Sequence, residues 1–302
     1  MALKDIKTKI QATERTHKVT RAMEAVSAVK MRKTQSAALS GRSYARAALS
    51  ILTRLAGTED VKRHPLAERR EVAKLALVLV TSDKGLAGAL NSGVIKAAVE
   101  ALAKYPAAEV SVYAYGKKGE EYFARRGYRI IQSFENKGDD VPLAVMETLT
   151  RDISDSFLRG DHDKVITVYS HFKSTFEQIP TMRRLLPLSL PALKDIVEGI
   201  IPAKGKWSHE PSLEAPKEYV VEPSGSDVLD TLIPRLIAVS LYHMLLEAKA
   251  SEHSARMVAM KNASDKSKEV AHDLTRIFNK IRQAAITREV SEIISGREAL
   301  AT

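Results

Sequence analysis

The sequence predicts an α/β protein with a long antiparallel coiled coil, in which the N- and C-terminal helices pair and a small domain lies between them in chain order. Residues 3–56 contain no proline and a single glycine, and residues 227–295 contain no glycine and a single proline. At a rise of 1.5 Å per residue, helices over these segments would be roughly 80 Å and roughly 100 Å long. The average globular helix has only about 11 or 12 residues. Helices of this length predict a rod that braces other parts or transmits force.

Both long segments repeat apolar or small residues at alternating spacings of three and four. The repeat runs from Leu3 to Leu55 in the first segment and from Leu229 to Ile281 in the second. A sustained spacing of 3.5 residues predicts a left-handed coiled coil. Two such helices in one chain most simply pair with each other in antiparallel orientation. Because many seam residues are small or polar, the pair buries little apolar area, and we expect it to be only modestly stable alone.

The end of the C-terminal helix is predicted to project beyond its partner. The two segments differ by about 15 residues, which corresponds to roughly 20–25 Å of helix. The last turns carry apolar residues that are not confined to one stripe: Ile281, Ala284, Ala285, Ile286, Val290, Ile293 and Ile294. A helix that is apolar on several faces needs a surround. No other part of this chain obviously supplies one, so the pattern predicts a partner that encloses the tip.

Between the long helices the pattern changes to short apolar runs separated by helical segments. We expect strands at 74–82, 110–115, 128–131 and 165–171, an edge strand at 184–190, and helices at 86–104 and 142–158. This alternation favours a small Rossmann-like domain with a mostly parallel sheet. The predicted division of the chain is an N-terminal coiled-coil helix (1–57), a central α/β domain (72–210), and a foot segment with the C-terminal coiled-coil helix (211–302).

The positive charge of the chain is concentrated at its N-terminal end. The net charge is +10, and residues 1–57 hold 12 Lys and Arg against 3 Asp and Glu. A solvated helix face would explain this pattern; the functional alternative is an acidic partner, either phosphates or an acidic protein surface. The track Lys30, Arg32, Lys33, Arg42 and Arg46 has Tyr44 as its lone nearby aromatic residue. A nucleic-acid adaptor therefore stays open as an alternative, but without stacking residues.

The segment Ser82–Asn91 (SDKGLAGALN) follows a predicted strand and opens a helix, where α/β proteins bind phosphate. It matches neither the dinucleotide pattern G-x-G-x-x-G nor the phosphate loop that ends in GK[ST]. A tight structural turn is the favoured interpretation. An α/β nucleotide-binding enzyme with helical arms remains the alternative.

Other chemistry is not indicated. The chain has no cysteine, which rules out disulfides and thiolate metal sites and fits a reducing compartment. Its eight histidines show no metal-ligand spacing, and no Ser/His/Asp constellation is apparent. We therefore predict no catalytic residue, metal or cofactor. We expect neither a membrane span nor a signal peptide, because no run of 18 apolar residues and no N-terminal apolar region occur.

Several stretches carry a resemblance to a known family. These are Ala250–Ala263 (ASEHSARMVAMKNA), Asn279–Glu289 (NKIRQAAITRE), Lys18–Val26 (KVTRAMEAV) and the turn Ser82–Asn91. They resemble, in order along the chain, the gamma subunit of F-type ATP synthases of the bacterial kind. Ala87, Ala89 and Pro234 depart from the family pattern.

The resemblance implies the central rotor shaft of a proton-translocating F-type ATP synthase, without a catalytic site of its own. Such a shaft couples rotation of the membrane c-ring to conformational changes at catalytic sites on partner beta subunits. The implied partners are the alpha3beta3 hexamer, the epsilon subunit and the c-ring. The implied location is the cytoplasmic face of the plasma membrane, as a peripheral protein.

The resemblance also implies two sets of contact residues. Those expected to touch the catalytic subunits are Met23, Lys30, Arg32, Lys33, Arg256, Gln283 and Thr287. Those expected to touch the c-ring, at the foot of the shaft, are Tyr219, Val221 and Glu222.

Overall fold

The structure is a computed structural model that describes residues 3–40, 64–136, 138, 140–189 and 225–301. The chain divides into two compact units. One unit is Ala28–Ala255, and the other combines Met1–Ser27 with Arg256–Thr302. The two long helices α1 (Leu3–Ser40) and α8 (Gly225–Ala301) each contribute residues to both units. Two of the predicted domain boundaries, near 57 and near 210, lie outside the described residues and stay predictions.

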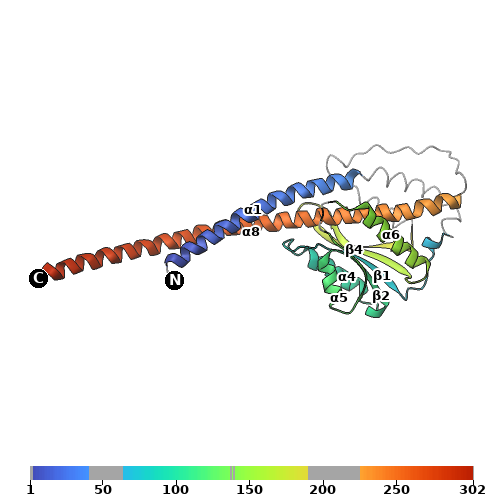
Figure 1. Cartoon of the computed structure of the whole chain (residues 1–302), viewed down its shortest axis with the longest axis horizontal. Helices are drawn as coiled ribbons and strands as arrows, with labels where there is room; N and C mark the ends of the chain where they lie inside the picture. Colours follow the sequence, from blue (N-terminus) through green and yellow to red (C-terminus); the bar gives the residue numbers. More distant parts are fainter. Residues whose placement is uncertain (1–2, 41–63, 137, 139, 190–224, 302) are drawn as a thin grey trace. The chain divides into compact units, whose positions relative to one another are not determined.

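The unit of residues 28–255 is built on one five-stranded sheet with the order β3-β2-β1-β4-β5 (Figure 1). The pairs β1–β2, β1–β4 and β2–β3 are parallel, and β4–β5 is antiparallel. The mostly parallel sheet expected from the sequence is therefore confirmed. Its strands are β1 (Leu75–Val80), β2 (Val110–Tyr115), β3 (Arg129–Phe134), β4 (Lys164–Phe172) and β5 (Gln178–Leu186).

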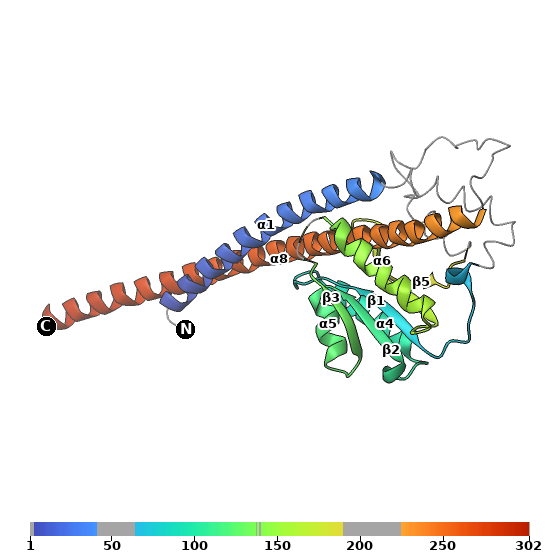
Figure 2. The same cartoon turned by 45° about the vertical axis from the view of Figure 1, so that its right-hand side comes forward.

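Helices cover both faces of this sheet (Figure 2). Along β1, Leu75, Leu77 and Leu79 face the core beneath α4 and α5, whereas alternate residues face the core beneath α6 and the first part of α8. Both faces of β1 are buried, which explains its uninterrupted apolar sequence. The remaining elements of this unit are η1 (Pro65–Ala67), α4 (Leu90–Leu102), η2 (Ala107–Glu109), α5 (Lys117–Ala124) and α6 (Leu143–Leu158).

Two predicted boundaries were wrong. The helix expected from Leu86 begins at Leu90, because Leu86 and Gly88 have φ values of 64° and 57°, in the left-handed region that no α-helix accepts. The edge strand expected at 184–190 is β5, which starts at Gln178 and ends before Pro187. Pro180 lies inside β5. Proline is tolerated there because the sheet order places β5 at an edge.

By length and composition, α8 is apolar enough to cross a membrane, with a stretch of mean hydropathy 1.4. The sequence predicted no such helix, because polar residues interrupt this stretch and no run of 18 consecutive apolar residues occurs. Half of that stretch is buried inside the structure. Leu229, Ile233, Leu236 and Leu241 belong to the core beneath β1 and α6. The apolar character of this part of α8 is therefore accounted for by packing in the α/β unit.

Candidate interaction surfaces

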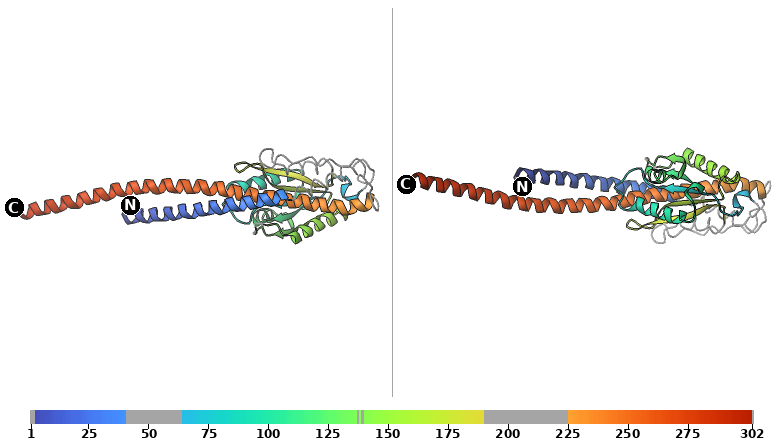
Figure 3. Two further views of the ribbon diagram at one scale, coloured as in Figure 1. Left: turned by 90° about the horizontal axis from the view of Figure 1, so that it is seen from above. Right: turned by 90° about the horizontal axis from the view of Figure 1, so that it is seen from below.

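The first part of α1 pairs with the second part of α8 in antiparallel orientation (Figure 3). The imidazole Nδ1 of His17 lies 3.0 Å from both the carbonyl oxygen and the hydroxyl of Ser264. The side chains most buried in this pair are few and mostly small or polar: Ile6, Thr20, Ser27, Met260, Ser264 and Ala271. The predicted antiparallel pair with a small-residue seam is confirmed for residues 3–27 and 256–301. The seam predicted for the first part of α8 is wrong, because Leu229, Leu236 and Leu246 belong to the core of the α/β unit instead.

The C-terminal end of α8 extends past the start of α1 (Figures 1 and 3). Large apolar side chains along this end are between 48% and 71% exposed: Ile277, Ile286, Val290, Ile293 and Ile294. Exposed large apolar side chains gathered at one end of a helix mark a site of interaction with another molecule. The predicted projecting tip is confirmed.

The weak seam leads to a prediction for the isolated chain. Backbone amides of residues 3–27 in α1 are expected to exchange with deuterium at least about tenfold faster than those of β1, because local opening there exposes little apolar area. Hydrogen-exchange mass spectrometry of the purified chain measures both segments in one experiment. Equal protection of α1 and β1 would contradict the expectation that the pair is only modestly stable alone.

The predicted contact residues of α1 are accessible to different degrees. Arg32 and Lys33 are exposed, and Met23 and Lys30 are half-buried. The ammonium of Lys33 lies 3.3 Å from a carboxylate oxygen of Asp140. Both side chains of this pair are largely exposed, so the ion pair is worth only about 0–1 kcal/mol. A carboxylate from another molecule could replace Asp140 at little cost.

The contact residues of α8 fall into two separate places. Gln283 and Thr287 are exposed and lie one turn apart, and the Thr287 hydroxyl donates a hydrogen bond of 3.0 Å to the Gln283 carbonyl. Arg256 is half-buried and stands 27 positions before Gln283, which is about 40 Å along a helix. The structure thus brings Gln283 and Thr287 together but leaves Arg256 apart. Tyr219, Val221 and Glu222 lie outside the described residues.

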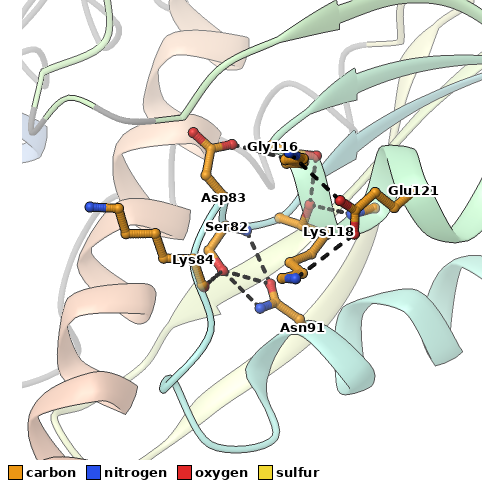
Figure 4. Close-up of polar contacts among 10 residues, drawn as sticks. Ser82, Asp83, Lys84, Asn91, Gly116, Lys118 and Glu121 are labelled. Atoms are coloured by element: carbon orange, nitrogen blue, oxygen red, sulfur yellow. Dashed lines mark hydrogen bonds and ion pairs between the residues drawn. The ribbon is translucent and has the colours of Figure 1, made fainter.

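The turn after β1 is held by its own polar side chains (Figure 4). The carboxylate of Asp83 accepts hydrogen bonds from the backbone N–H groups of Lys117, at 2.9 Å, and Asn136, at 2.8 Å. The Asn91 side chain bonds both the backbone N–H and the hydroxyl of Ser82. Asp83 therefore places a negative charge at the N-terminus of α5, where a phosphate would otherwise find N–H donors. This geometry supports the structural turn and weakens the nucleotide-binding alternative.

Polar contacts fasten the middle of α8 to the sheet. The buried ammonium of Lys249 donates to the side-chain oxygen of Asn136 at 2.5 Å and to the carbonyl of Gly138 at 2.6 Å. The Ser251 hydroxyl donates to the Ser170 carbonyl, within β4, at 2.9 Å. The Ser254 hydroxyl donates to the Thr175 carbonyl, in the turn after β4, at 2.6 Å. The role of Lys249 was not predicted from the sequence. The one feature that could have indicated it is the position of this lysine among small residues, Ala248, Ala250 and Ser251, which are themselves buried.

A second buried cluster is centred on Glu247, two residues before Lys249 on α8. The Glu247 carboxylate lies 2.9 Å from Nδ1 of His171, on β4, and 3.1 Å from Nε2 of His243. Burial alone would raise the pKa of Glu247, but the hydrogen bonds and charges of His171 and His243 outweigh it and lower the pKa to about 2.

Among the residues that the structure describes, no three His, Cys, Asp or Glu side chains are grouped so that they could hold a metal ion.

Comparison with known proteins identifies the family. The profile of the family described as ATP synthase matches residues 2–300. A protein named ATP synthase gamma chain from Pelotomaculum thermopropionicum is 38% identical over 300 residues, covering 99% of both chains. One of the same name from Roseiflexus castenholzii is 40% identical over 302 residues, covering 99% of this chain and 98% of that one.

Solved structures share the fold. A chain of the Euglena gracilis mitochondrial ATP synthase, determined with F1 and the c-ring, aligns with a TM-score of 0.66 and 16% identity over 99% of this chain and 94% of that one. A chain of the central stalk and c-ring of the Tetrahymena thermophila enzyme aligns with a TM-score of 0.60 and 24% identity, over 82% and 99%. At these identities the likeness concerns the fold, whereas the sequence matches establish that the chain belongs to the ATP synthase gamma chain family.

Proposed function

We propose that this chain is the central shaft of an ATP synthase, a non-catalytic subunit that turns inside a ring of catalytic subunits. The projecting end of α8 is the observation that carries the proposal. This end of α8 extends beyond α1 (Figure 3), and its Ile286, Val290, Ile293 and Ile294 side chains are exposed. Such a helix end needs an enclosing surface. Membership of the gamma chain family points to the hexamer of alternating alpha and beta subunits as that surface.

Contacts with the catalytic beta subunits are assigned to two groups of residues. The first group lies on α1 and comprises Met23, Lys30, Arg32 and Lys33. The second lies on α8 and comprises Arg256, Gln283 and Thr287. Because about 40 Å of helix separates Arg256 from Gln283, these two positions meet different parts of the ring. The excess of basic residues over positions 1–57 favours acidic loops as the surface opposite α1.

The membrane end of the shaft is assigned to the foot segment and the α/β unit. Tyr219, Val221 and Glu222 are proposed to touch the c-ring, and the α/β unit is proposed to lie beside the epsilon subunit. The resemblance of the sequence to the family supports these assignments. The Tetrahymena chain of similar fold comes from a structure whose title joins the central stalk to the c-ring.

The mechanism follows from asymmetry. Ions flowing through the membrane turn the ring, and the shaft turns with it. A pair of helices with different surfaces has no three-fold symmetry, so each catalytic subunit meets a different face of the shaft. Each orientation interacts differently with open and closed catalytic sites, so rotation shifts their populations and releases ATP. The buried contacts of Lys249, Ser251 and Ser254 tie α8 to the sheet, so that torque on the α/β unit reaches the helix.

The location follows from the complex. The chain acts as a subunit of the membrane-associated synthase, and it reaches the membrane only through its partners. The finer proposal places it on the cytoplasmic face of the plasma membrane, with protons as the coupling ion. Fractionation of membranes at low salt, with identification of the copurifying partners, tests the location; recovery of the chain without alpha and beta subunits would reject it.

Reconstitution with alpha and beta subunits tests the shaft directly. The chain has no cysteine, so a single Lys104→Cys substitution in the exposed turn after α4 allows a bead to be attached at one place. We expect one copy of the chain for three alpha and three beta subunits, and rotation of the bead driven by ATP hydrolysis. Hydrolysis without rotation, or failure to form the complex, would reject the proposal.

The contact residues on α8 are tested in the same reconstituted complex. Arg256→Ala combined with Gln283→Ala is expected to lower the rate of ATP hydrolysis by about fivefold or more, because each removes a hydrogen bond of about 1 kcal/mol to a catalytic subunit. The matched control is Lys268→Ala, an exposed position of α8 without an assigned contact, which should keep the rate of the unmodified complex. An unchanged rate in the double variant would contradict the assignment of Arg256 and Gln283 to contacts with the catalytic subunits.

A further inference from the structure

A polar pocket of about 330 Å³ opens at the amino ends of β1, β2 and β3, on the side of the sheet covered by α6. It lies at the opposite ends of the strands from the Ser82–Asn91 turn. Its volume is that of a site for a small molecule. The residues assigned to rotor contacts do not line it, and the proposed function makes no use of it.

The floor of the pocket is built from buried polar side chains. Ser111, Tyr113, Ser156 and His162 line it, and each is at most 7% exposed. The Tyr113 hydroxyl is hydrogen-bonded to Ser156, whose own hydroxyl donates to the Ile153 carbonyl at 3.0 Å. Tyr113 and Ser156 therefore have partners within the floor, and the cost of a buried polar atom without a partner falls on Nδ1 of His162.

His162 is the most informative residue of the floor. Its Nδ1 is buried and has no hydrogen-bond partner among the described residues. Burial lowers the pKa of His162, so the ring is neutral near pH 7, although Asp161 and Asp163 act in the opposite direction. Arg129 and Lys74 also disfavour its charged form. A bound anion would offset these two cations and make the charged ring more favourable.

The rim carries an excess of positive charge. The Arg159 guanidinium is already held by the carboxylate of Asp161 at 2.9 Å. Within the described part of the chain, Lys74, Arg129 and Glu109 line the pocket without forming an ion pair. Outside the Arg159–Asp161 pair, the lining therefore holds two cations and one carboxylate. The nearby Asp163 carboxylate is occupied by the backbone N–H groups of Ala73 and Lys74, at 3.0 and 2.7 Å.

We propose that this pocket binds a small phosphate-bearing anion, held by Lys74 and Arg129 and by the hydroxyls of its floor. A guanidinium offers two parallel N–H donors to a phosphate, and an ammonium adds a point charge. The C-terminus of α6 is close by and would repel an anion. The last carbonyl groups of α6 are occupied, however. The Phe157 carbonyl accepts from the Arg70 guanidinium at 2.9 Å and from the Gly160 N–H at 3.1 Å. The Ser156 carbonyl accepts from the Asp161 N–H at 2.9 Å.

The test uses the full chain and inorganic phosphate as the probe. The titration of the His162 ring is followed by NMR in phosphate and in sodium chloride of equal ionic strength. Bound phosphate should raise the pKa of His162 by about one unit, with saturation at increasing phosphate. Arg129→Gln should weaken phosphate binding about tenfold. Arg125→Gln is the matched control, because it removes the same charge from an exposed position of the same unit that does not line the pocket.

Identical His162 titrations in phosphate and in chloride would overturn the proposal. So would equal weakening by Arg125→Gln and Arg129→Gln, because it would show diffuse charge attraction instead of a site. Both arginines are exposed, and Lys74→Gln offers a second variant at the rim. No partner subunit is needed, so the result is independent of the rotor function.

Discussion

Replacing Gly116 with alanine is expected to destabilise the α/β unit by more than about 4 kcal/mol. Gly116 has a φ of 106°, and a Cβ atom at this position would lie 1.9 Å from the carbonyl oxygen of Thr81. That oxygen belongs to the backbone, which is fixed on both sides: the Thr81 N–H donates to Tyr115, and the Gly116 N–H donates to Phe134. Neither chain can retreat without breaking these hydrogen bonds. Urea unfolding followed by circular dichroism measures the loss.

Gly127→Ala is the matched control for this substitution. Gly127 also has a positive φ, of 77°, but an added Cβ would meet no atom within 4 Å. It should therefore cost only the strain of the left-handed conformation, about 1–2 kcal/mol. Equal losses for the two variants would show that strain, and not the contact with Thr81, makes Gly116 necessary.

Glu247→Gln is expected to lower the free energy of unfolding by about 3 kcal/mol at pH 7. The substitution removes the buried negative charge that His171 and His243 contact, while it keeps the shape of the side chain. The pKa of Glu247 is lowered from 4.5 to about 2 in the folded chain. Its stabilising contribution is therefore fully present above about pH 4.5 and is lost as the pH falls toward 2. Chemical unfolding measured across this pH range tests the size and the position of the effect.

The control for Glu247→Gln is Glu269→Gln. Glu269 pairs with Lys266 at 2.8 Å on the exposed surface of α8, where such pairs contribute about 0–1 kcal/mol. It should change the stability by less than about 1 kcal/mol at any pH. If the Glu247→Gln variant lost stability between pH 4.5 and 2 as steeply as the unmodified chain, the assignment of this acid dependence to Glu247 would be wrong.

Elements with a long, repeated pattern could be predicted from the sequence, and elements defined by single backbone angles could not. The apolar run of β1 and the seam of α1 with α8 follow from periodicity, which averages over many residues. The start of α4 depends on two positive φ values, at Leu86 and Gly88, and leucine rarely adopts such a conformation. Local propensity therefore placed the start of that helix at Leu86, four residues too early.

The interaction surfaces show the same division. The projecting tip of α8 could be predicted because apolar residues on several faces of one helix are visible in the sequence. Gln283 and Thr287 could be paired because they stand one turn apart. The separation of Arg256 from them follows once α8 is known to be one continuous helix. Lys249, Asn136 and Glu247 could not be predicted as partners of the sheet, because their contacts join residues more than 70 positions apart.

The sequence by itself determined the helical ends, the strand and helix alternation between them, the uneven charge and the family of this protein, because these properties reside in local patterns and in motifs. Tertiary structure alone decided which polar groups have partners. Asp83 accepts from the ends of two neighbouring segments, Lys249 donates to the loop after β3, and the buried Nδ1 of His162 has no hydrogen-bond partner among the described residues. The free energy of a buried charge depends on the atoms that the fold brings within hydrogen-bonding distance, and this chain brings them from distant positions.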